Sequence, residues 1–309
     1  MSREKPILKF LNDHGLTGAR RDDEPMSPPD SRRNRVDWDR IRSAFRPSRG
    51  LDIDESREVK LLNPQHVHQL MGDFSNVIGN EPNLLETNCS SAGWDTCAWH
   101  QSMHHFGSDW GIFVRQDCII EHARDIGRFL VRGTAATPAL IERLLLAGFY
   151  SLYLHEEFHH RVESMGIRLE VASRKPIYCP YKDRVYRPTL GSDDNLEEAL
   201  ANANIFYRLS HSPYRQVLGR DVFQATRAYL WWRFQFDPPG YRRARDYVYG
   251  DRFDEGRSQL AAQIQEADLR PKQDASPWNI VRDMNTGLFR ISDRVWEVVS
   301  APGKPPLFP

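Results

Sequence analysis

The sequence has only four cysteines, Cys89, Cys97, Cys118 and Cys179, and no two of them form a C-x-x-C pair. This scattered spacing is not that of a disulfide framework. We therefore expect free thiols, which are typical of proteins in a reducing compartment.

Long apolar segments are also missing. No stretch reaches the roughly 18 uninterrupted apolar residues that cross a bilayer. The polar start, Met1 to Lys5, leads into no apolar segment of the kind found in signal peptides. These absences predict a soluble cytoplasmic protein with no membrane partner.

Charge of one sign is not in excess, because 42 Lys and Arg residues balance 42 Asp and Glu residues. This balance gives no indication of a nucleic-acid partner. The cluster of Trp231, Trp232 and Arg233, followed by Arg242 and Arg243, could stack on bases. Such a cluster is more typical of a core with a solvated face, so we do not expect nucleic acid to bind.

The chain does contain enough apolar material for a core, since 40% of its 309 residues are hydrophobic. Residues 1–58 are polar and broken by prolines, so we expect a flexible arm there. Residues 59–211 are predicted to form the main domain. Residues 212–309 are predicted to form a mainly helical extension packed on it.

The residue patterns predict an α+β fold in which helices dominate. Segments 97–103 and 110–115 are rich in strand formers, with a turn signal between them, and segment 117–130 has helical spacing. Thr137 and Pro138 are typical of a helix start, with Thr137 as the N-cap.

The helix that begins there is apolar on most sides as far as about Ser164, so we expect it to be buried. Alternating residues then predict a strand at 167–171 with a partner at 177–187. Asp193 or Asp194 is expected to cap a helix at 195–209. Further helices are predicted after Pro213, at 241–250 and at 255–267, and a last strand at 295–299.

The buried helix carries the motif H-E-x-x-H, from His155 to His159. Residues four apart share one face of a helix, so His155 and His159 can present two imidazoles to one cation. Glu156 lies beside the first ligand, where it can act as the general base for a water on zinc. The pattern predicts a catalytic Zn²⁺ site; the alternative is a structural histidine pair satisfied by hydrogen bonds.

A catalytic zinc takes a third protein ligand and keeps one position for water. We predict Glu198, because Asn202 follows one turn later and can orient a ligand, and because alanines surround it. Glu197 is the close competitor, but it is in phase with Ala201, which offers no polar support. Two other carboxylates, Asp194 and Glu163, are weaker alternatives.

An H-E-x-x-H helix followed by a helix with E-x-x-x-N resembles the gluzincin branch of zincin metallopeptidases. The stretch from Glu198 to Phe206 is similar to the E-x-x-A-N-x-F-A pattern of ImmA/IrrE-type peptidases, although Phe206 stands one position later. The resemblance, which spans His155 to Phe206, implies a zincin-like core and zinc binding by Glu198. It also implies cleavage of an intracellular protein, which in that group is often a transcription repressor.

Other residues are candidates for roles around this site. His100, His104 and His105 suggest a second metal site or a role in the cleft, or else are ordinary core or surface histidines. His160 points about 100° away from the ligand pair, so we expect a structural hydrogen bond or a substrate contact. Four tyrosines are candidates to stabilise an oxyanion: Tyr178, Tyr181, Tyr186 and Tyr207.

We predict a zinc-dependent hydrolase, and specifically a metallopeptidase acting on a protein or peptide. Strand 110–115 is the candidate to pair with an extended substrate. Two alternatives stay open: a zinc hydrolase of a non-protein amide or ester, and a non-enzymatic protein that keeps zinc for structure and binds a partner. A fourth protein ligand on the metal would favour the last alternative.

Overall fold

The computed structural model of the chain describes residues 64–80, 94–106, 110–173, 175–210, 214–249, 251–267 and 296–299. The predicted arm, residues 1–58, lies outside these ranges. The described elements are α3 (Pro64–Ser75), η1 (Trp94–Thr96), β1 (Ala98–Gln101), α4 (Met103–Phe106), β2 (Gly111–Arg115), α5 (Gln116–Arg128), α6 (Pro138–Ser173), α7 (Tyr178–Tyr181), η3 (Lys182–Tyr186), α8 (Arg187–Thr189), α9 (Leu196–Leu209), α10 (Tyr214–Arg233), η4 (Tyr241–Asp246), α11 (Arg252–Glu266) and β3 (Trp296–Val299). The expected helix-dominated α+β class is confirmed.

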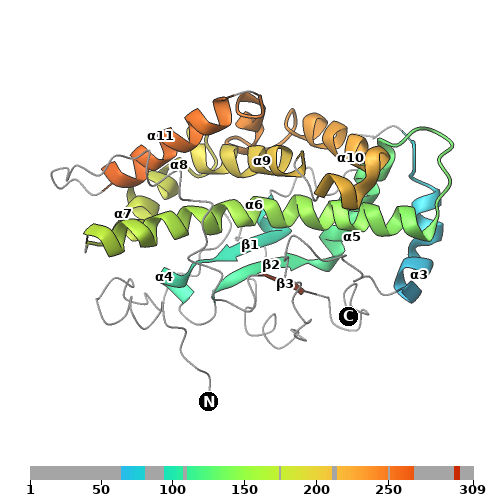
Figure 1. Cartoon of the computed structure of the whole chain (residues 1–309), viewed down its shortest axis with the longest axis horizontal. Helices are drawn as coiled ribbons and strands as arrows, with labels where there is room; N and C mark the ends of the chain where they lie inside the picture. Colours follow the sequence, from blue (N-terminus) through green and yellow to red (C-terminus); the bar gives the residue numbers. More distant parts are fainter. Residues whose placement is uncertain are drawn as a thin grey trace, which may run out of the picture.

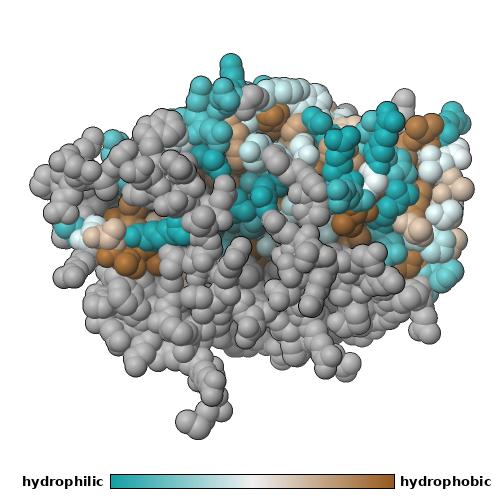
Figure 2. All heavy atoms as spheres, in the orientation of Figure 1, coloured by the Kyte–Doolittle hydropathy of each residue, from teal (hydrophilic) through white to brown (hydrophobic). Residues whose placement is uncertain are grey.

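Helix α6, which is 36 residues long, runs through the middle of the fold (Figure 1). Helices α9, α10 and α11 lie on one side of it, and the sheet lies on the other. Most of its side chains are buried, as predicted. Figure 2 shows hydrophilic and hydrophobic side chains intermixed over the helical layer. A helix in this central position can bring groups from both layers to one site.

The sheet has the strand order β1-β2-β3. Strand β1 pairs antiparallel with β2, and β3 pairs parallel with β2. The strands predicted at 97–103, 110–115 and 295–299 are confirmed, although β1 ends at Gln101 and helix α4 follows it. The turn expected at 107–109 lies outside the described residues.

Helix α6 begins as predicted but continues further. Thr137 Oγ1 accepts a hydrogen bond from the Leu140 amide at 3.2 Å, so Thr137 caps the helix. The helix runs to Ser173, and the strand predicted at 167–171 is wrong. Glu163 and Glu170 lie two turns apart on one face of the helix, and both contact the His104 side chain in α4. A strand would point residues seven apart to opposite faces, so it would not allow both contacts.

The partner strand predicted at 177–187 is also wrong, because this segment forms the helical turns α7, η3 and α8. Pro180 is compatible with α7 because it lies in the first turn, where a missing amide N–H loses no intrahelical hydrogen bond. With both strands replaced by helix, the described sheet is limited to β1, β2 and β3.

The helix predicted at 195–209 is confirmed as α9, but its cap differs from the prediction. Asn195 is the N-cap, and its side chain accepts a hydrogen bond from the Glu198 amide at 3.1 Å. Asp193 instead forms an ion pair with Arg242. The cap therefore lies three residues before Glu198 and holds the start of the helix in place.

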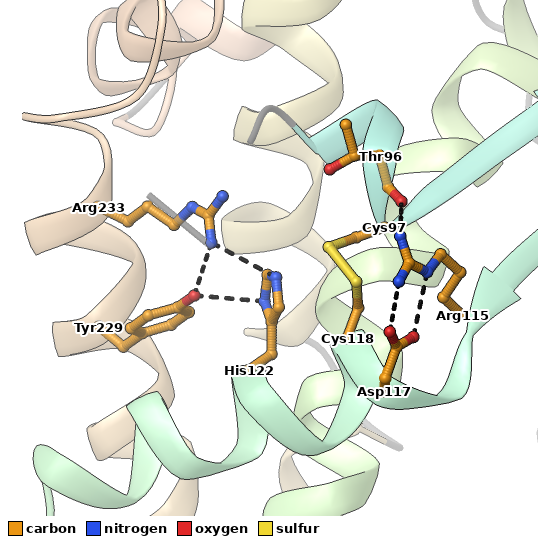
Figure 3. The surroundings of a disulfide bond; sticks show 8 residues. All are labelled: Thr96, Cys97, Arg115, Asp117, Cys118, His122, Tyr229 and Arg233. Atoms are coloured by element: carbon orange, nitrogen blue, oxygen red, sulfur yellow. Dashed lines mark hydrogen bonds and ion pairs between the residues drawn. A yellow bond between two sulfur atoms is a disulfide. The ribbon is translucent and has the colours of Figure 1, made fainter. Parts of the chain in front are cut away.

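The expectation of free thiols is wrong for Cys97 and Cys118, which form a disulfide (Figure 3). Cys97 precedes β1, Cys118 lies in the first turn of α5, and β2 leads directly into α5. Pairing of β1 with β2 therefore brings the two Cα atoms to 5.4 Å, which a disulfide can bridge. Beside it, Arg115 pairs with Asp117 and donates to the Thr96 carbonyl at 3.2 Å. The free-thiol argument for a reducing compartment is thereby lost, and the cytoplasmic location stays a prediction.

The helices after residue 212 lie against the central part of the fold. Helix α10 contacts α5 and α6, and α11 contacts α9. Among the described helices, none combines the length and the apolarity needed to cross a lipid bilayer. The division into an arm, a main domain and an extension stays a prediction.

Replacing Gly148 by Ala should destabilise the protein, because a Cβ atom there would lie 2.5 Å from the Ile119 carbonyl oxygen of α5. We expect the free energy of unfolding to fall by about 1–3 kcal/mol in denaturant titrations. Gly72 in α3 is a matched control, since no atom from another element of the described structure lies within 4 Å of its Cβ position. Gly72→Ala should be neutral or stabilising by up to about 1 kcal/mol, and equal stability of the two variants would contradict this packing.

Reduction of the Cys97–Cys118 disulfide should lower stability. The bridge closes a loop with a sequence separation of 21, and a loop of this size is worth about 3 kcal/mol. Denaturant unfolding with and without a reductant measures the difference. The double variant Cys97→Ser/Cys118→Ser should lose this sensitivity to reductant, whereas Cys179→Ser should keep it.

Candidate metal centre

Three buried side chains converge where α6 meets the first turn of α9. His155 Nε2 lies 3.2 Å from His159 Nε2, and Glu198 Oε2 lies 3.3 Å and 3.4 Å from these two nitrogens. Ligand atoms held tetrahedrally at about 2.0–2.1 Å from zinc would be about 3.3–3.4 Å apart. The spacing of the three side chains, which we call the α6–α9 site, therefore matches that of ligands on one zinc ion.

The Nδ1 atoms of both imidazoles, which point away from Glu198, each lie beside a hydrogen-bond acceptor. His155 Nδ1 lies 2.8 Å from Asn202 Oδ1, and His159 Nδ1 lies 2.6 Å from Glu197 Oε1. Each partner favours a proton on Nδ1, which leaves the Nε2 lone pair directed at the common point with Glu198. The predicted orienting role of Asn202 is thus supported by its position.

Glu197 has a larger role than the sequence suggested. It is not left without polar support, because it contacts His159 and accepts a hydrogen bond from the Tyr181 hydroxyl at 2.6 Å. Lys182 Nζ lies 3.5 Å from the same carboxylate. Burial would raise the pKa of Glu197, but Lys182 and the hydrogen bond with His159 outweigh it, and the pKa is lowered. Glu197 therefore orients a ligand as an ionised carboxylate.

The electrostatics of the α6–α9 site depend on Glu198 and His159. Burial would lower the pKa of His159, but the Glu198 carboxylate and the contact with Glu197 reverse the shift and raise it. Burial would raise the pKa of Glu198, but the two imidazoles lower it well below its usual value. A carboxylate this deeply buried requires a positive charge beside it, which a proton on His159 or a divalent cation can supply.

Two of the four candidate tyrosines lie at this site. The Tyr186 hydroxyl donates to Glu198 Oε1, and the Tyr181 hydroxyl donates to Glu197, as described above. Tyr178 packs against His104 with ring centroids 4.7 Å apart. Tyr207 stacks on Phe253 and is 38% exposed, so it is not brought to the site.

A polar chain behind His155 was missed by sequence reasoning. Asn202 Nδ2 donates to Asp237 Oδ2 at 3.2 Å, and Arg233 Nε donates to Asp237 Oδ1 at 2.9 Å. Trp94 Nε1 also donates to Asp237, at 3.1 Å, and the indole stacks on His155. Asp237 follows α10 in a turn, and no motif in the sequence marks it.

Arg233 continues this chain toward the disulfide. Its guanidinium donates to the Tyr229 hydroxyl at 2.9 Å, and both residues contact His122 of α5 (Figure 3). Arg233 is thus committed to a buried network, and Arg242 is committed to Asp193. Arg233 is buried, whereas Trp231 and Arg242 are exposed, so the cluster is partly core and partly a solvated face, as predicted.

Glu156 is 2% exposed and follows His155 on α6. Helix geometry turns it about 100° from His155. Glu156 therefore lies away from the α9 side of the helix. It lies on the side where His160 and Glu163 contact His100 of β1. Asp194 is exposed and lies outside the ligand group.

Two of the three histidines, His100 and His104, contact the same carboxylate, Glu163, and the metal or cleft role suggested for them stays a prediction. His104 contacts Glu163 and Glu170, each at 2.7 Å, and these carboxylates raise its pKa to about 9 although burial alone would lower it. His100 lies 3.3 Å from Glu163. His105 instead contacts the Ser102 hydroxyl at 2.7 Å. The contacts of His100 and His104 therefore join the β1–α4 segment to α6.

Zinc affinity of glutamine variants should distinguish the two carboxylates of α9. Glu198→Gln should weaken binding at least about 100-fold because a ligand is lost, whereas Glu197→Gln should weaken it about 10–100-fold because only the support of His159 is lost. Titration against a chelator provides the measurement.

Glu255, exposed in the first turn of α11, provides the matched control, and Glu255→Gln should leave zinc affinity unchanged. A larger loss in Glu197→Gln than in Glu198→Gln would mean that the roles of the two carboxylates are reversed.

Comparisons of the chain with protein-family models, with curated proteins and with solved structures give no match. The resemblance to gluzincin and ImmA/IrrE-type peptidases therefore stays a prediction. The function has to be argued from the geometry of the α6–α9 site.

Proposed function

We propose that the chain is a zinc-dependent hydrolase, and specifically a metallopeptidase. The observation that carries the proposal is the spacing of 3.2–3.4 Å among His155 Nε2, His159 Nε2 and Glu198 Oε2. A zinc ion held by these atoms would polarise a carbonyl group and lower the pKa of water. Asn202 and Glu197 support the ligand geometry from behind.

An open position on the metal distinguishes a catalytic site from a structural one. Within the described residues, the ligand group contains three side chains, His155, His159 and Glu198. This number supports a catalytic site over the alternative of a zinc held only for structure. Glu156 is proposed to accept the proton of the attacking water, and Tyr186, which is already at the site, is the tyrosine best placed to stabilise an oxyanion.

An extended substrate would pair with β1. The role expected for strand 110–115 is wrong, because β2 is paired with β1 on one side and β3 on the other. In the described sheet, β1 is an edge strand, and it contacts α6. Pairing there would lay a peptide along the side of α6 toward which Glu156 is turned.

The role of Glu156 can be tested by Glu156→Gln, which should keep zinc but lose nearly all hydrolysis, because an amide cannot accept the proton. Digestion of a proteome-derived peptide library, followed by mass spectrometry, measures cleavage. Glu157→Gln is the matched control, since Glu157 lies next to it on α6 but pairs with Arg161 at 2.5 Å. It should cleave like the parent protein.

Cleavage by Glu156→Gln at the parent rate would show that the assigned base is wrong. A parent protein that binds zinc, cleaves no peptide and hydrolyses small amides or esters would favour the non-protein hydrolase instead.

A further inference from the structure

A second group of possible ligands lies where β1 contacts α6. His100 Nε2 is 3.3 Å from His160 Nδ1 and 3.3 Å from Glu163 Oε2. The ligand atoms of the three side chains all lie within 4.8 Å of one another. His160 and Glu163 are buried, and the His100 side chain is 5% exposed. This group shares no residue with the α6–α9 site.

Successive residues of α6 are offset by about 100° around the helix axis, so one helix can contribute ligands to both groups. His155 and His159 share a face that meets α9. Glu163 and His160 lie about 40° and 100° further around the helix from His159, and this neighbouring face meets β1. The two groups therefore have separate ligands.

The two contacts of His100 are at the long end of the hydrogen-bond range. Hydrogen bonds from nitrogen to oxygen are usually about 2.9–3.0 Å long, and His104, in the same cluster, contacts Glu163 and Glu170 at 2.7 Å. The two 3.3 Å separations of His100 are longer. They match the spacing of atoms bound to one zinc ion, about 3.3–3.4 Å, which is also the spacing in the α6–α9 site.

The carboxylate oxygens of the cluster have different partners. Glu163 Oε1 lies 2.7 Å from His104 Nδ1, and Glu170 Oε2 lies 2.7 Å from His104 Nε2. Glu170 Oε1 accepts the amide hydrogens of Ile177 and Tyr178. Glu163 Oε2 is the oxygen that faces His100, so it is the one in position to bind a cation.

We propose that His100, His160 and Glu163 bind a second divalent metal ion of the zinc class, at what we call the α6–β1 site. Two imidazoles and one carboxylate are a ligand set that zinc accepts. An ion there would cross-link β1 to α6 beside the side of the helix that carries Glu156. The proposal does not depend on the proposed function, because the two sites have separate ligands.

The number of zinc ions bound by the full chain tests the proposal. His160→Phe removes the ligand atom but keeps a ring to stack on Trp110, whose centroid is 5.3 Å from that of His160. After dialysis against Zn²⁺ and removal of excess metal, the parent should hold about two equivalents, and His160→Phe and Glu198→Gln about one each. The double variant should hold none. His105→Asn is the control and should keep both.

Two results would overturn the second site: a parent that holds one equivalent which His160→Phe retains, or a parent that holds none. One equivalent that is lost in His160→Phe but kept in Glu198→Gln would support the α6–β1 site and contradict the proposed function. If circular dichroism shows that His160→Phe is unfolded, the α6–β1 site is tested by the melting temperature of Glu198→Gln, measured with and without Zn²⁺. A rise with Zn²⁺ supports the site, and no change overturns it.

Discussion

The burial of ionisable side chains on α6 is the constraint on which the rest of the structure depends. A buried charged or polar group is costly unless another group satisfies it. Helix α6 buries three histidines and three glutamates: His155, His159, His160, Glu156, Glu163 and Glu170. Each neighbouring layer contributes partners to them: α9 contributes two carboxylates and an amide, and the β1–α4 segment contributes two imidazoles. The same contacts that satisfy α6 therefore also hold the layers in position.

The site extends into the part of the chain that follows residue 212. Asp237, in the turn after α10, receives hydrogen bonds from Asn202, Trp94 and Arg233. Burial raises the pKa of Asp237 although Arg233 and Trp94 oppose the shift. The helices predicted as an extension thus support the orientation of His155. Removing them would disturb the α6–α9 site as well as the packing.

The errors of sequence reasoning have identifiable causes. Helix phase favoured Glu198 over Glu197 as the ligand, because Ala201 offers Glu197 no polar support one turn later. Adjacent residues in a first turn lie on either side of the direction that faces α6, so both carboxylates reach a histidine. The alternation of Ile167, Leu169 and Val171 predicted a strand, but tertiary contacts of Glu163 and Glu170 keep this segment helical. Cys97 and Cys118 are brought together by strand pairing, which spacing along the chain does not reveal.

The sequence by itself determined the local features: the long buried helix, its Thr137 cap, the two strands before it, and the pair His155 and His159 on one face. These follow from periodicity and capping, which act over a few residues. Only the tertiary structure decided that Glu197 as well as Glu198 contacts the pair, which strand forms the edge of the described sheet, and that His100 lies against His160 and Glu163. Those outcomes depend on how distant elements pack, because the rotation and depth of one helix against another are set by all the side chains between them.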